Sequence, residues 1–426
     1  MPTATLTPAL DIHWVRSQFP ALAQAINGYP AAFLDGPGGT QVPQRVIDAI
    51  SDYLRRDNAN TGGAYQTGRN TDIMIAGARA AMADFLNCAA EEVVFGPNMT
   101  TLTYAISRSF GRELKPGDEI VLTRLDHDAN VSPWTALAED CQRDGRGVTV
   151  RWLNFRHEDC TLDMADLAAK INSKTKLVAV GYASNAVGTI NPVKEIARLA
   201  RQAGALSYID AVHYGPHGLI DVADLGCDFL VCSTYKFFGP HMGVLYGKRE
   251  HLDRLRPYKV RPLADTSPIR WEWGTLNHEC IAGITACVDY IASIGYHASS
   301  ELKSRRAAIV AAYAAIHEHE RAIILRMLAE LKTIPGLKIY GISDPSRIDQ
   351  RCATLAVRID GHTPLQLATK LGDRGIFTWD GNYYAINVSE ALGVEKSGGF
   401  LRIGFVHYNT MDEADRLLAV LREIAG

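Results

Sequence analysis

An acid and a lysine, each placed just after an apolar stretch, are the residues of this chain whose spacing best suits chemistry. Asp210 follows residues 207–209, and Lys236 ends a Ser-x-x-Lys segment after residues 229–231. If both stretches are neighbouring strands, the carboxylate and the amine meet at one edge of a sheet. A lysine that bonds a cofactor aldehyde, with an acid that keeps a pyridine nitrogen protonated, frames a pyridoxal phosphate site. Taken singly, the two residues are more simply a core-edge acid and a surface lysine.

The composition is that of an ordinary globular protein. The chain has 426 residues, 47% of them hydrophobic and 21% charged, which is enough for one large domain and a smaller one. We expect an N-terminal segment over 1–30, a large cofactor-binding domain over 31–297, and a linking helix with a small C-terminal domain over 298–426. The net charge of -3 gives no basic field for nucleic acid or an anionic membrane.

No targeting, membrane or metal motif stands out in the sequence. No apolar run approaches the roughly 20 residues that span a bilayer, and residues 1–5 lack a charged-then-apolar signal pattern. We therefore expect a cytoplasmic protein without a membrane partner. The eight cysteines form no Cys-x-x-Cys pair, which favours reduced core thiols over disulfides or a metal site.

Short apolar stretches alternate with amphipathic helical patterns from residue 93 onward. This alternation predicts an α/β fold with a doubly wound, mainly parallel sheet, whose last strand follows a short turn and is expected to run antiparallel. The predicted strands are 93–95, 120–122, 148–150, 177–180, 206–209, 229–231 and 244–246. Helices are predicted over 11–27, 43–56, 71–87 and 298–332. The sequence after residue 332 predicts an α+β arrangement, with strands at 337–340, 353–359 and 401–405 and helices at 364–374 and 411–424.

Polar residues follow several of these predicted strands, where ligands bind in such sheets. Thr100 opens a helix and offers a hydroxyl to an anion, although a plain helix cap explains it equally well. His127 is flanked by Asp126 and Asp128, which would favour its protonated form if they lie close in the fold; a lone histidine is more often structural. Asn185 supplies an amide that suits a ring oxygen or an Asx turn.

Two glycine-rich stretches add candidate edges of a site. The turn at 35–40 allows close approach of backbone to a ligand but lacks the Lys-Ser/Thr ending of a phosphate loop. The loop at 58–65 is too rich in glycine for a helix, and we place its Asn60 near the substrate.

Five motifs in a fixed order carry a family resemblance. They are Asp-His-Asp-Ala-Asn at 126–130, Ala-Ser-Asn-Ala-Val-Gly-Thr at 183–189, Ile-Asp-Ala-Val-His at 209–213, Ser-Thr-Tyr-Lys at 233–236 and Gly-Thr-Leu-Asn at 274–277. In this order the chain resembles the cysteine desulfurase group of class V aminotransferases, which are fold-type I pyridoxal phosphate enzymes. The resemblance covers nearly the whole chain, from Phe33 to Thr410.

The resemblance implies a role for each matched position. Lys236 binds pyridoxal 5'-phosphate covalently, Asp210 pairs with its pyridine nitrogen, and His127 stacks on the ring and acts with Lys236 in catalysis. The other implied contacts are Thr100 and Ser233 to the phosphate, Asn185 to the ring hydroxyl, and Arg402 to the substrate carboxylate. His213 stands where desulfurases commonly have glutamine, and Tyr235 where they commonly have histidine. Thr275 resembles the threonine that reaches a neighbouring subunit's phosphate, which implies a homodimer with shared active sites.

One departure from the family pattern concerns the reaction. Desulfurases carry a mobile cysteine after the strand that corresponds to 375–379, but here no cysteine lies between Cys352 and Gly426. The loop at 379–384 takes its place, and we expect Trp379 and Tyr383 to line the substrate pocket; a packed surface loop explains them about as well.

The sequence therefore disfavours a persulfide mechanism and favours a lyase that acts at Cα and Cβ of a small α-amino acid. Either β-elimination, or β-decarboxylation with carbon–carbon bond formation, fits this chemistry. Transamination, and desulfuration with an unexpected sulfur acceptor, stay open as alternatives. A noncatalytic binding protein is disfavoured because Lys236 and Asp210 are both present.

Overall fold

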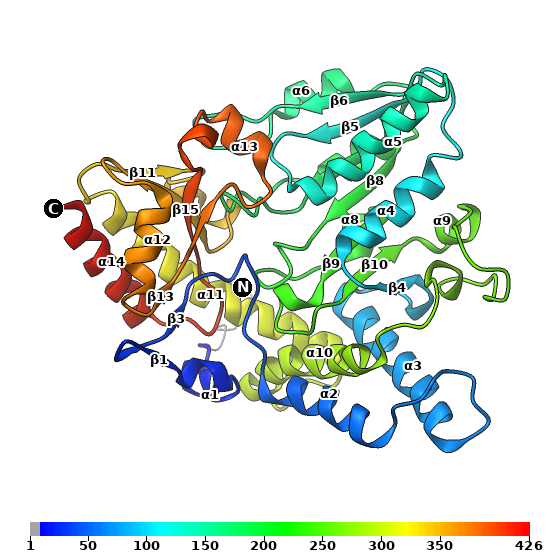
Figure 1. Ribbon diagram of the computed structural model, residues 1–426, viewed down its shortest axis with the longest axis horizontal. Coiled ribbons are helices and arrows are strands. Elements are labelled where there is room, and N and C mark those ends of the chain that lie inside the picture. Colours follow the sequence, from blue (N-terminus) through cyan, green and yellow to red (C-terminus); the bar gives the residue numbers. More distant parts are fainter. Residues whose placement is uncertain (1–8) are drawn as a thin grey trace, which may run out of the picture.

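A seven-stranded sheet forms the centre of the computed structural model, which describes residues 9–426 (Figure 1). Residues 1–8, the start of the predicted N-terminal segment, lie outside the described part. The strand order is β4-β10-β9-β8-β7-β5-β6, and only β10 runs antiparallel to its neighbours. The strands are β4 (Val93–Gly96), β5 (Glu119–Thr123), β6 (Thr149–Leu153), β7 (Thr175–Gly181), β8 (Leu206–Asp210), β9 (Phe229–Ser233) and β10 (Gly243–Gly247). The predicted fold, including the antiparallel last strand, is confirmed.

Both faces of this sheet are covered by helices. Along β5, for example, Ile120 and Leu122 join the core beneath α4 (Met99–Phe110) and α5 (Ser132–Arg143). Val121 points into the opposite core, with α3 (Gln66–Leu86), α7 (Val193–Gln202) and α10 (His278–Ala298). Because successive side chains of a strand point to opposite faces, a continuous apolar run suits a sheet buried on both sides.

The helices lie close to their predicted positions, with two corrections. The helix expected over 11–27 is only α1 (Ile12–Ser17), because Pro20 restricts Phe19 to an extended conformation. The helix expected over 298–332 is α11 (Arg305–Leu331), capped by Ser304 and separated from α10 by residues 299–304. The remaining α-helices are α2 (Gln44–Arg56), α6 (Met164–Lys170), α8 (Val222–Leu225), α9 (Arg249–Arg254), α12 (Pro364–Gly372), α13 (Ile386–Ala391) and α14 (Met411–Ala425).

A smaller antiparallel sheet organises the C-terminal part, in the order β11-β12-β15-β14. Its strands are β11 (Leu337–Tyr340), β12 (Thr354–Ile359), β14 (Trp379–Gly381) and β15 (Phe400–Gly404). In Figure 1 this part, with α12 and α14, forms one side of the molecule, and the seven-stranded sheet forms the other.

One N-terminal strand belongs with this smaller part. β3 (Ala32–Phe33) pairs in parallel with β13 (Ile376–Phe377), and Leu34 packs into the C-terminal core. Two further short strands, β1 (Ala25–Ile26) and β2 (Tyr29–Pro30), pair with each other just before it. The division of the chain into domains at 31 and 298 stays a prediction.

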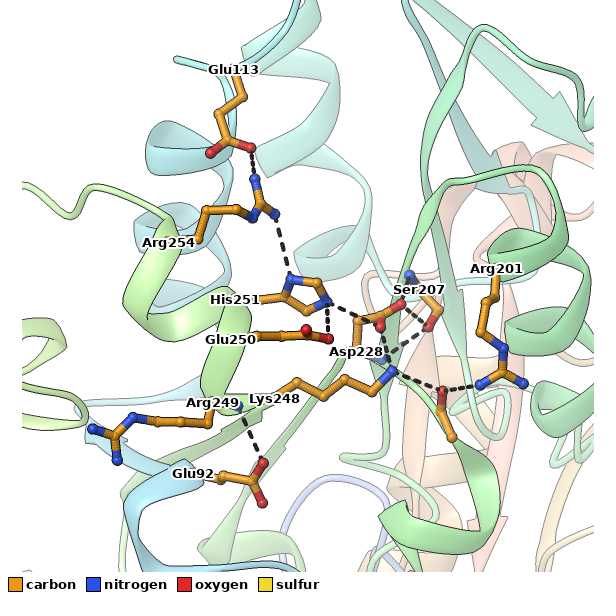
Figure 2. Close-up of polar contacts among 11 residues, drawn as sticks. Glu92, Glu113, Arg201, Ser207, Asp228, Lys248, Arg249, Glu250, His251 and Arg254 are labelled. Atoms are coloured by element: carbon orange, nitrogen blue, oxygen red, sulfur yellow. Dashed lines mark hydrogen bonds and ion pairs between the residues drawn. The ribbon is translucent and has the colours of Figure 1, made fainter.

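A buried ion-pair network holds the amino ends of β8 and β9 (Figure 2). Asp228, directly before β9, accepts hydrogen bonds from Lys248 Nζ at 2.6 Å and from the amide and hydroxyl of Ser207, both at 2.9 Å. His251 Nε2 lies 3.2 Å from the same carboxylate. These contacts tie the loop after β10 to two central strands on the edge opposite the predicted site.

The cysteines and the helices bear on two further predictions. All eight thiols are free and six are buried, which confirms that most cysteines are core residues. None of the helices between residues 9 and 426 combines the length and the apolarity that a bilayer-spanning segment requires.

Candidate active site

A cavity of about 560 Å³ opens between the carboxyl ends of the central strands and the C-terminal sheet. Nine of the predicted site residues line it: Thr100, His127, Asn185, Asp210, His213, Lys236, Trp379, Tyr383 and Arg402. Strand ends supply Asp210 and the turn to Lys236, and β14 and β15 supply Trp379 and Arg402. The topology therefore gathers residues from most of the chain into one pocket.

Lys236 and Asp210 lie in this cavity as the sequence predicts. Asp210 ends β8, and Lys236 ends the short 3-10 turn Thr234–Lys236 that follows β9. Lys236 Nζ donates to the carbonyl oxygens of Pro37 at 2.5 Å and Gly38 at 3.0 Å. Burial, assisted by Arg402, lowers the pKa of Lys236 to about 7. Near neutral pH this amine therefore exists partly without its proton, as a base requires.

The Asp210 carboxylate has few hydrogen-bond partners, and the one that it has lies in the turn directly after it. Its Oδ1 accepts one hydrogen bond, from the amide of Val212 at 2.9 Å. Burial, with a smaller effect from Asp126, raises the pKa of Asp210 to about 7. A cation placed against this carboxylate would favour its charged form.

The side chain of His127 differs from the sequence expectation in its charge. Its Nδ1 accepts the amide hydrogen of Ala129 at 2.9 Å, which leaves the ring proton on Nε2. Burial, followed by Lys236 and Arg402, lowers its pKa to about 4. The prediction that its acidic neighbours favour the protonated form is therefore wrong.

The two acids beside His127 are engaged elsewhere. Asp126 accepts hydrogen bonds from Gly181 N, Thr123 and Asn130, and Asp128 accepts one from Ser132 at 2.5 Å. The face of the His127 ring is instead covered by Tyr384, with ring centroids 5.5 Å apart and planes 26° apart.

The start of helix α4 offers a site for an anion. Asn98 caps the helix through the amide of Thr101 at 2.8 Å, and Met99 and Thr100 line the cavity. The amide of Met99 donates to Ser233 Oγ at 3.1 Å, which places the buried Ser233 against this helix end although it does not line the cavity itself. Helix N-termini bind phosphate through free amides and the helix dipole.

Arg402 is buried in an aromatic and amide setting. Its guanidinium lies 4.1 Å from the ring centroid of Tyr383 and 6.0 Å from that of Trp379, and it donates to the carbonyl oxygen of Asn185 at 3.0 Å. Its Nε has no hydrogen-bond partner among residues 9–426. Because part of the fork is unpaired, Arg402 can bind a carboxylate.

The loop at 379–384 is tied to the cavity rather than left on the surface. Asn185 Nδ2 donates to the carbonyl oxygen of Tyr383 at 2.9 Å, and the amide of Asp128 donates to that of Tyr384 at 2.7 Å. The Tyr383 hydroxyl bonds the carbonyl oxygens of Trp379 and Phe400. Both tyrosines have left-handed backbone angles, φ 57° and 60°.

Besides Ser233, two predicted site residues do not line the cavity of their own chain. Asn60 is exposed and bonds the neighbouring Thr61 amide, and Thr275 is exposed before α10. Their predicted roles stay predictions. The sequence reading also missed Asp35 and Tyr384 as individual site residues.

Asp35 lies near two of the cavity's cations. Burial raises its pKa to about 6, while Arg402 and Lys236 act in the opposite direction. Its place in the glycine-rich turn after β3 was the only sequence signal. In the same turn, a Cβ added at Gly38 would lie 2.5 Å from the Trp379 ring, so only glycine allows this approach.

The chain is similar to known proteins along almost its whole length. The family model for aminotransferase class-V matches residues 32–417. A cysteine desulfurase of Pectobacterium carotovorum subsp. carotovorum is 32% identical over 429 residues, which cover 97% of this chain and 98% of that protein. A cysteine desulfurase of Synechococcus elongatus is 35% identical, over 97% of this chain and 64% of that protein.

The solved structures lead to the same fold. The apo structure of a cysteine desulfurase from Thermococcus onnurineus superposes with a TM-score of 0.86 at 26% identity, covering 98% of both chains. A cysteine desulfurase from Escherichia coli has a TM-score of 0.82 at 23% identity, also with 98% of both chains covered.

Proposed function

Because the chain belongs to the class-V aminotransferase family, whose members use pyridoxal phosphate, we propose that it is a lyase-type enzyme acting at Cα and Cβ of a small α-amino acid. The reaction is β-elimination, or β-decarboxylation followed by carbon–carbon bond formation. One observation carries this choice: the cavity joins a base, an acid and a carboxylate-binding arginine, yet no cysteine from residues 9–426 lines it.

The cavity residues suit the cofactor at each of its ends. Asp210 would hold the pyridine nitrogen, and Thr100, Ser233 and the start of α4 would hold the phosphate. The buried Asn185 Oδ1 and both ring nitrogens of His213 have no hydrogen-bond partner within the described chain, so polar groups stand ready for a bound ring. The cofactor supplies an electron sink for bond breaking at Cα and Cβ.

The protein's own groups then have separate tasks. Arg402 binds the substrate carboxylate, and the Tyr383 ring holds the guanidinium in place. Lys236 Nζ, with its pKa lowered to about 7, takes the proton from Cα and, in β-elimination, gives a proton to the group that leaves Cβ. His127, as a neutral imidazole, would stack on the cofactor ring. The loop at 379–384 forms one wall of the cavity beside Arg402.

The position of Cys352 argues against a persulfide step. It is the last cysteine in the sequence and lies just before β12, but it lies outside the lining of this cavity and is 3% exposed. Burial raises the pKa of its thiol well above the usual range. Since the thiolate is the nucleophile, a buried thiol is a poor sulfur acceptor.

We further propose a homodimer in which the partner completes the site. A second hollow, lined by Arg108, His241 and Trp273, shares Thr100 and Tyr235 with the cavity and thus reaches the phosphate end. Thr275, two residues after Trp273, is exposed and thus accessible to a second chain, as the proposed dimer requires. Co-expressed Lys236→Ala and Thr275→Ala chains should recover activity in mixed dimers if sites are shared; a monomer in light scattering would contradict the dimer.

Product analysis tests the reaction. Purified holoenzyme is given cysteine, cysteine conjugates, aspartate, or aspartate with an aldehyde, and products are identified by mass spectrometry. We expect pyruvate with sulfide or a thiol, or carbon dioxide with a γ-hydroxy amino acid. Alanine with enzyme-bound persulfide would overturn the proposal in favour of desulfuration, and a keto acid formed without elimination would overturn it in favour of transamination.

A further inference from the structure

Three buried side chains that can bind a metal lie together between the active-site cavity, which His213 lines, and a second cavity, which the other two line. They are His213 and His217, which follow β8, and Cys352, which precedes β12. Their ligand atoms lie within 4.8 Å of one another, and the residues are only 4%, 5% and 3% exposed. The cluster thus joins the large sheet to the C-terminal part of the chain.

The imidazoles of this cluster are unsatisfied. Both ring nitrogens of His213 and the Nε2 of His217 are buried and have no hydrogen-bond partner anywhere in residues 9–426. A neutral imidazole has one donor and one acceptor, and buried polar groups are almost always paired. One nitrogen from each of two neighbouring imidazoles, without a partner and next to a thiol, indicates a ligand between the two rings.

Glu320 of α11 orients one of these imidazoles. Its Oε2 lies 2.7 Å from His217 Nδ1, and the residue is 5% exposed. If Nδ1 donates to the carboxylate, the lone pair of Nε2 faces the cluster. A carboxylate behind a histidine is the outer-shell arrangement of metal-bound imidazoles, in which it fixes the tautomer and raises ligand basicity.

We propose that His213, His217 and Cys352 bind one divalent metal ion of the zinc class, with Glu320 as the carboxylate that orients His217. Two neutral imidazoles and a thiolate are the donors that zinc prefers, at bond lengths of about 2.0–2.3 Å. Small side-chain rotations bring ligand atoms within 4.8 Å of one another onto such an ion. As the sulfur–metal bond forms, the Cys352 thiol releases its proton to solvent.

The surrounding charges suit this ion. Binding of the dication with release of the thiol proton adds one positive charge, and the ion, the thiolate and the Glu320 carboxylate then sum to zero beside the buried Arg351. Within residues 9–426, that guanidinium donates to three carbonyl oxygens, of Ile342, Cys352 and Thr354. The thiolate gives it an anion nearby.

A cavity of about 720 Å³ reaches the cluster from the other side. His217, Glu320 and Cys352 line it together with Tyr182 and Tyr214, whose rings are stacked 3.7 Å apart. Three protein ligands leave a fourth position for water, and this cavity gives water access. His213 lines the active-site cavity instead. A metal on one of its ring nitrogens leaves the other protonated, so the ion sets His213 as a hydrogen-bond donor.

The scattered spacing of the ligands explains why the sequence suggested no metal site. His213 and His217 are four residues apart, but Cys352 joins them only through the contact between the two parts of the chain.

Metal content tests the proposal directly. Holoenzyme purified without a polyhistidine tag is analysed by mass spectrometry for zinc, as isolated and after incubation with zinc and desalting. We expect about one zinc per chain. Metal-free enzyme titrated with Co²⁺ should show the visible bands of a tetrahedral site and a sulfur-to-cobalt charge-transfer band in the near ultraviolet. Absence of both zinc and cobalt binding in folded holoenzyme would overturn the proposal.

Variants assign the ligands. Cys352→Ser should remove the charge-transfer band, and His217→Ala should abolish binding. Glu320→Gln should weaken zinc affinity by about 10–100-fold while the band remains. Cys141 is a fully buried thiol on α5, so Cys141→Ser is the matched control. It should keep both the zinc affinity and the charge-transfer band. A band that persists in Cys352→Ser contradicts the site.

If the cluster variants fail to fold, protection of the native thiol decides instead. In the unsubstituted protein, zinc should slow alkylation of Cys352, measured by peptide mass spectrometry, and leave Cys141 unaffected. Equal alkylation with and without zinc would overturn the proposal. None of these readouts depends on which reaction the enzyme performs.

Discussion

Two aspartates at opposite edges of the β8–β9 strand pair differ in their surroundings. One lies in the candidate active site and the other in a structural ion-pair network. Asp210 and Asp228 are equally buried, each 7% exposed. Asp228 accepts bonds from Lys248, His251 and Ser207, which together overcome the effect of burial and lower its pKa well below the usual range (Figure 2). Asp210 accepts a single amide hydrogen, and burial raises its pKa to about 7.

The difference lies in what each carboxylate is left to bind. Asp228 has all its partners from within the protein, so its charge contributes to the stability of the sheet. Asp210 lies in a cavity, and its missing partner is supplied by a ligand. An under-paired acid and a well-paired acid of equal exposure, at opposite edges of one strand pair, therefore separate function from structure.

The largest effect is expected from Lys236, which lies at the same edge of the sheet as Asp210. Lys236→Ala should lower kcat/KM by at least about 10³-fold, because it removes the proposed proton carrier. The visible absorbance of the covalently bound cofactor should also be lost. Circular dichroism checks that the fold is unchanged. Activity near that of the parent would remove Lys236 from its assigned role.

Asp210→Asn should lower kcat/KM by about 10²–10³-fold, the usual cost of removing one electrostatic contact to the reacting system. In the cofactor-free protein, however, the same substitution should increase stability relative to the parent as pH rises. With a pKa of about 7 in the folded state and about 3.9 unfolded, the folded protein binds more protons, so stability falls as pH rises through this interval.

Chemical denaturation of the cofactor-free parent and Asp210→Asn should therefore show the variant gaining relative stability between about pH 4 and 7. A variant that is less stable than the parent above pH 7 would mean that Asp210 is a structural acid like Asp228.

Asp228→Asn should lower the free energy of unfolding by about 2 kcal/mol at pH 7, below the usual cost of breaking a buried pair because Lys248 reaches solvent. Since the folded pKa is depressed, this contribution is present above the unfolded pKa of about 3.9 and is lost as pH falls through the folded value. Activity per bound cofactor should be unchanged. A variant with normal stability and impaired turnover would reverse the comparison.

Tyr383→Leu should have the smallest effect, a rise in KM of about 2–30-fold from loss of the ring over Arg402, with kcat little changed. Ile73→Ala, at an exposed apolar side chain of α3 outside the cavity, serves as a control. If substrate choice and turnover are unaltered in Tyr383→Leu and in Trp379→Ala, the loop at 379–384 does not shape the pocket.

The strands of the sheet were predictable because each is a short apolar run that can be recognised from the local sequence alone. Helix limits were harder, since they depend on single residues: Pro20 ends the first helix through its effect on Phe19. The residues at strand ends were found for the same reason as the strands, because parallel topology brings those ends together.

The rest of the site depends on contacts that no local pattern contains. The charge of His127 is set by burial and by Lys236 and Arg402, whereas the neighbouring Asp126 is turned toward Gly181. Tyr384 reaches His127 through two consecutive left-handed residues, which sequence patterns do not predict for tyrosine.

The pairing of β3 with β13 affects when the site can exist during synthesis. A ribosome delivers Ala32 and Phe33 early, but their partners Ile376 and Phe377 emerge near the end. The turn that follows β3 supplies the two carbonyl oxygens that bind Lys236. The seven strands can assemble on the nascent chain, whereas the amine of Lys236 gains its final setting only once β13 has been made. A cofactor that bound before then would meet an open and unfinished pocket.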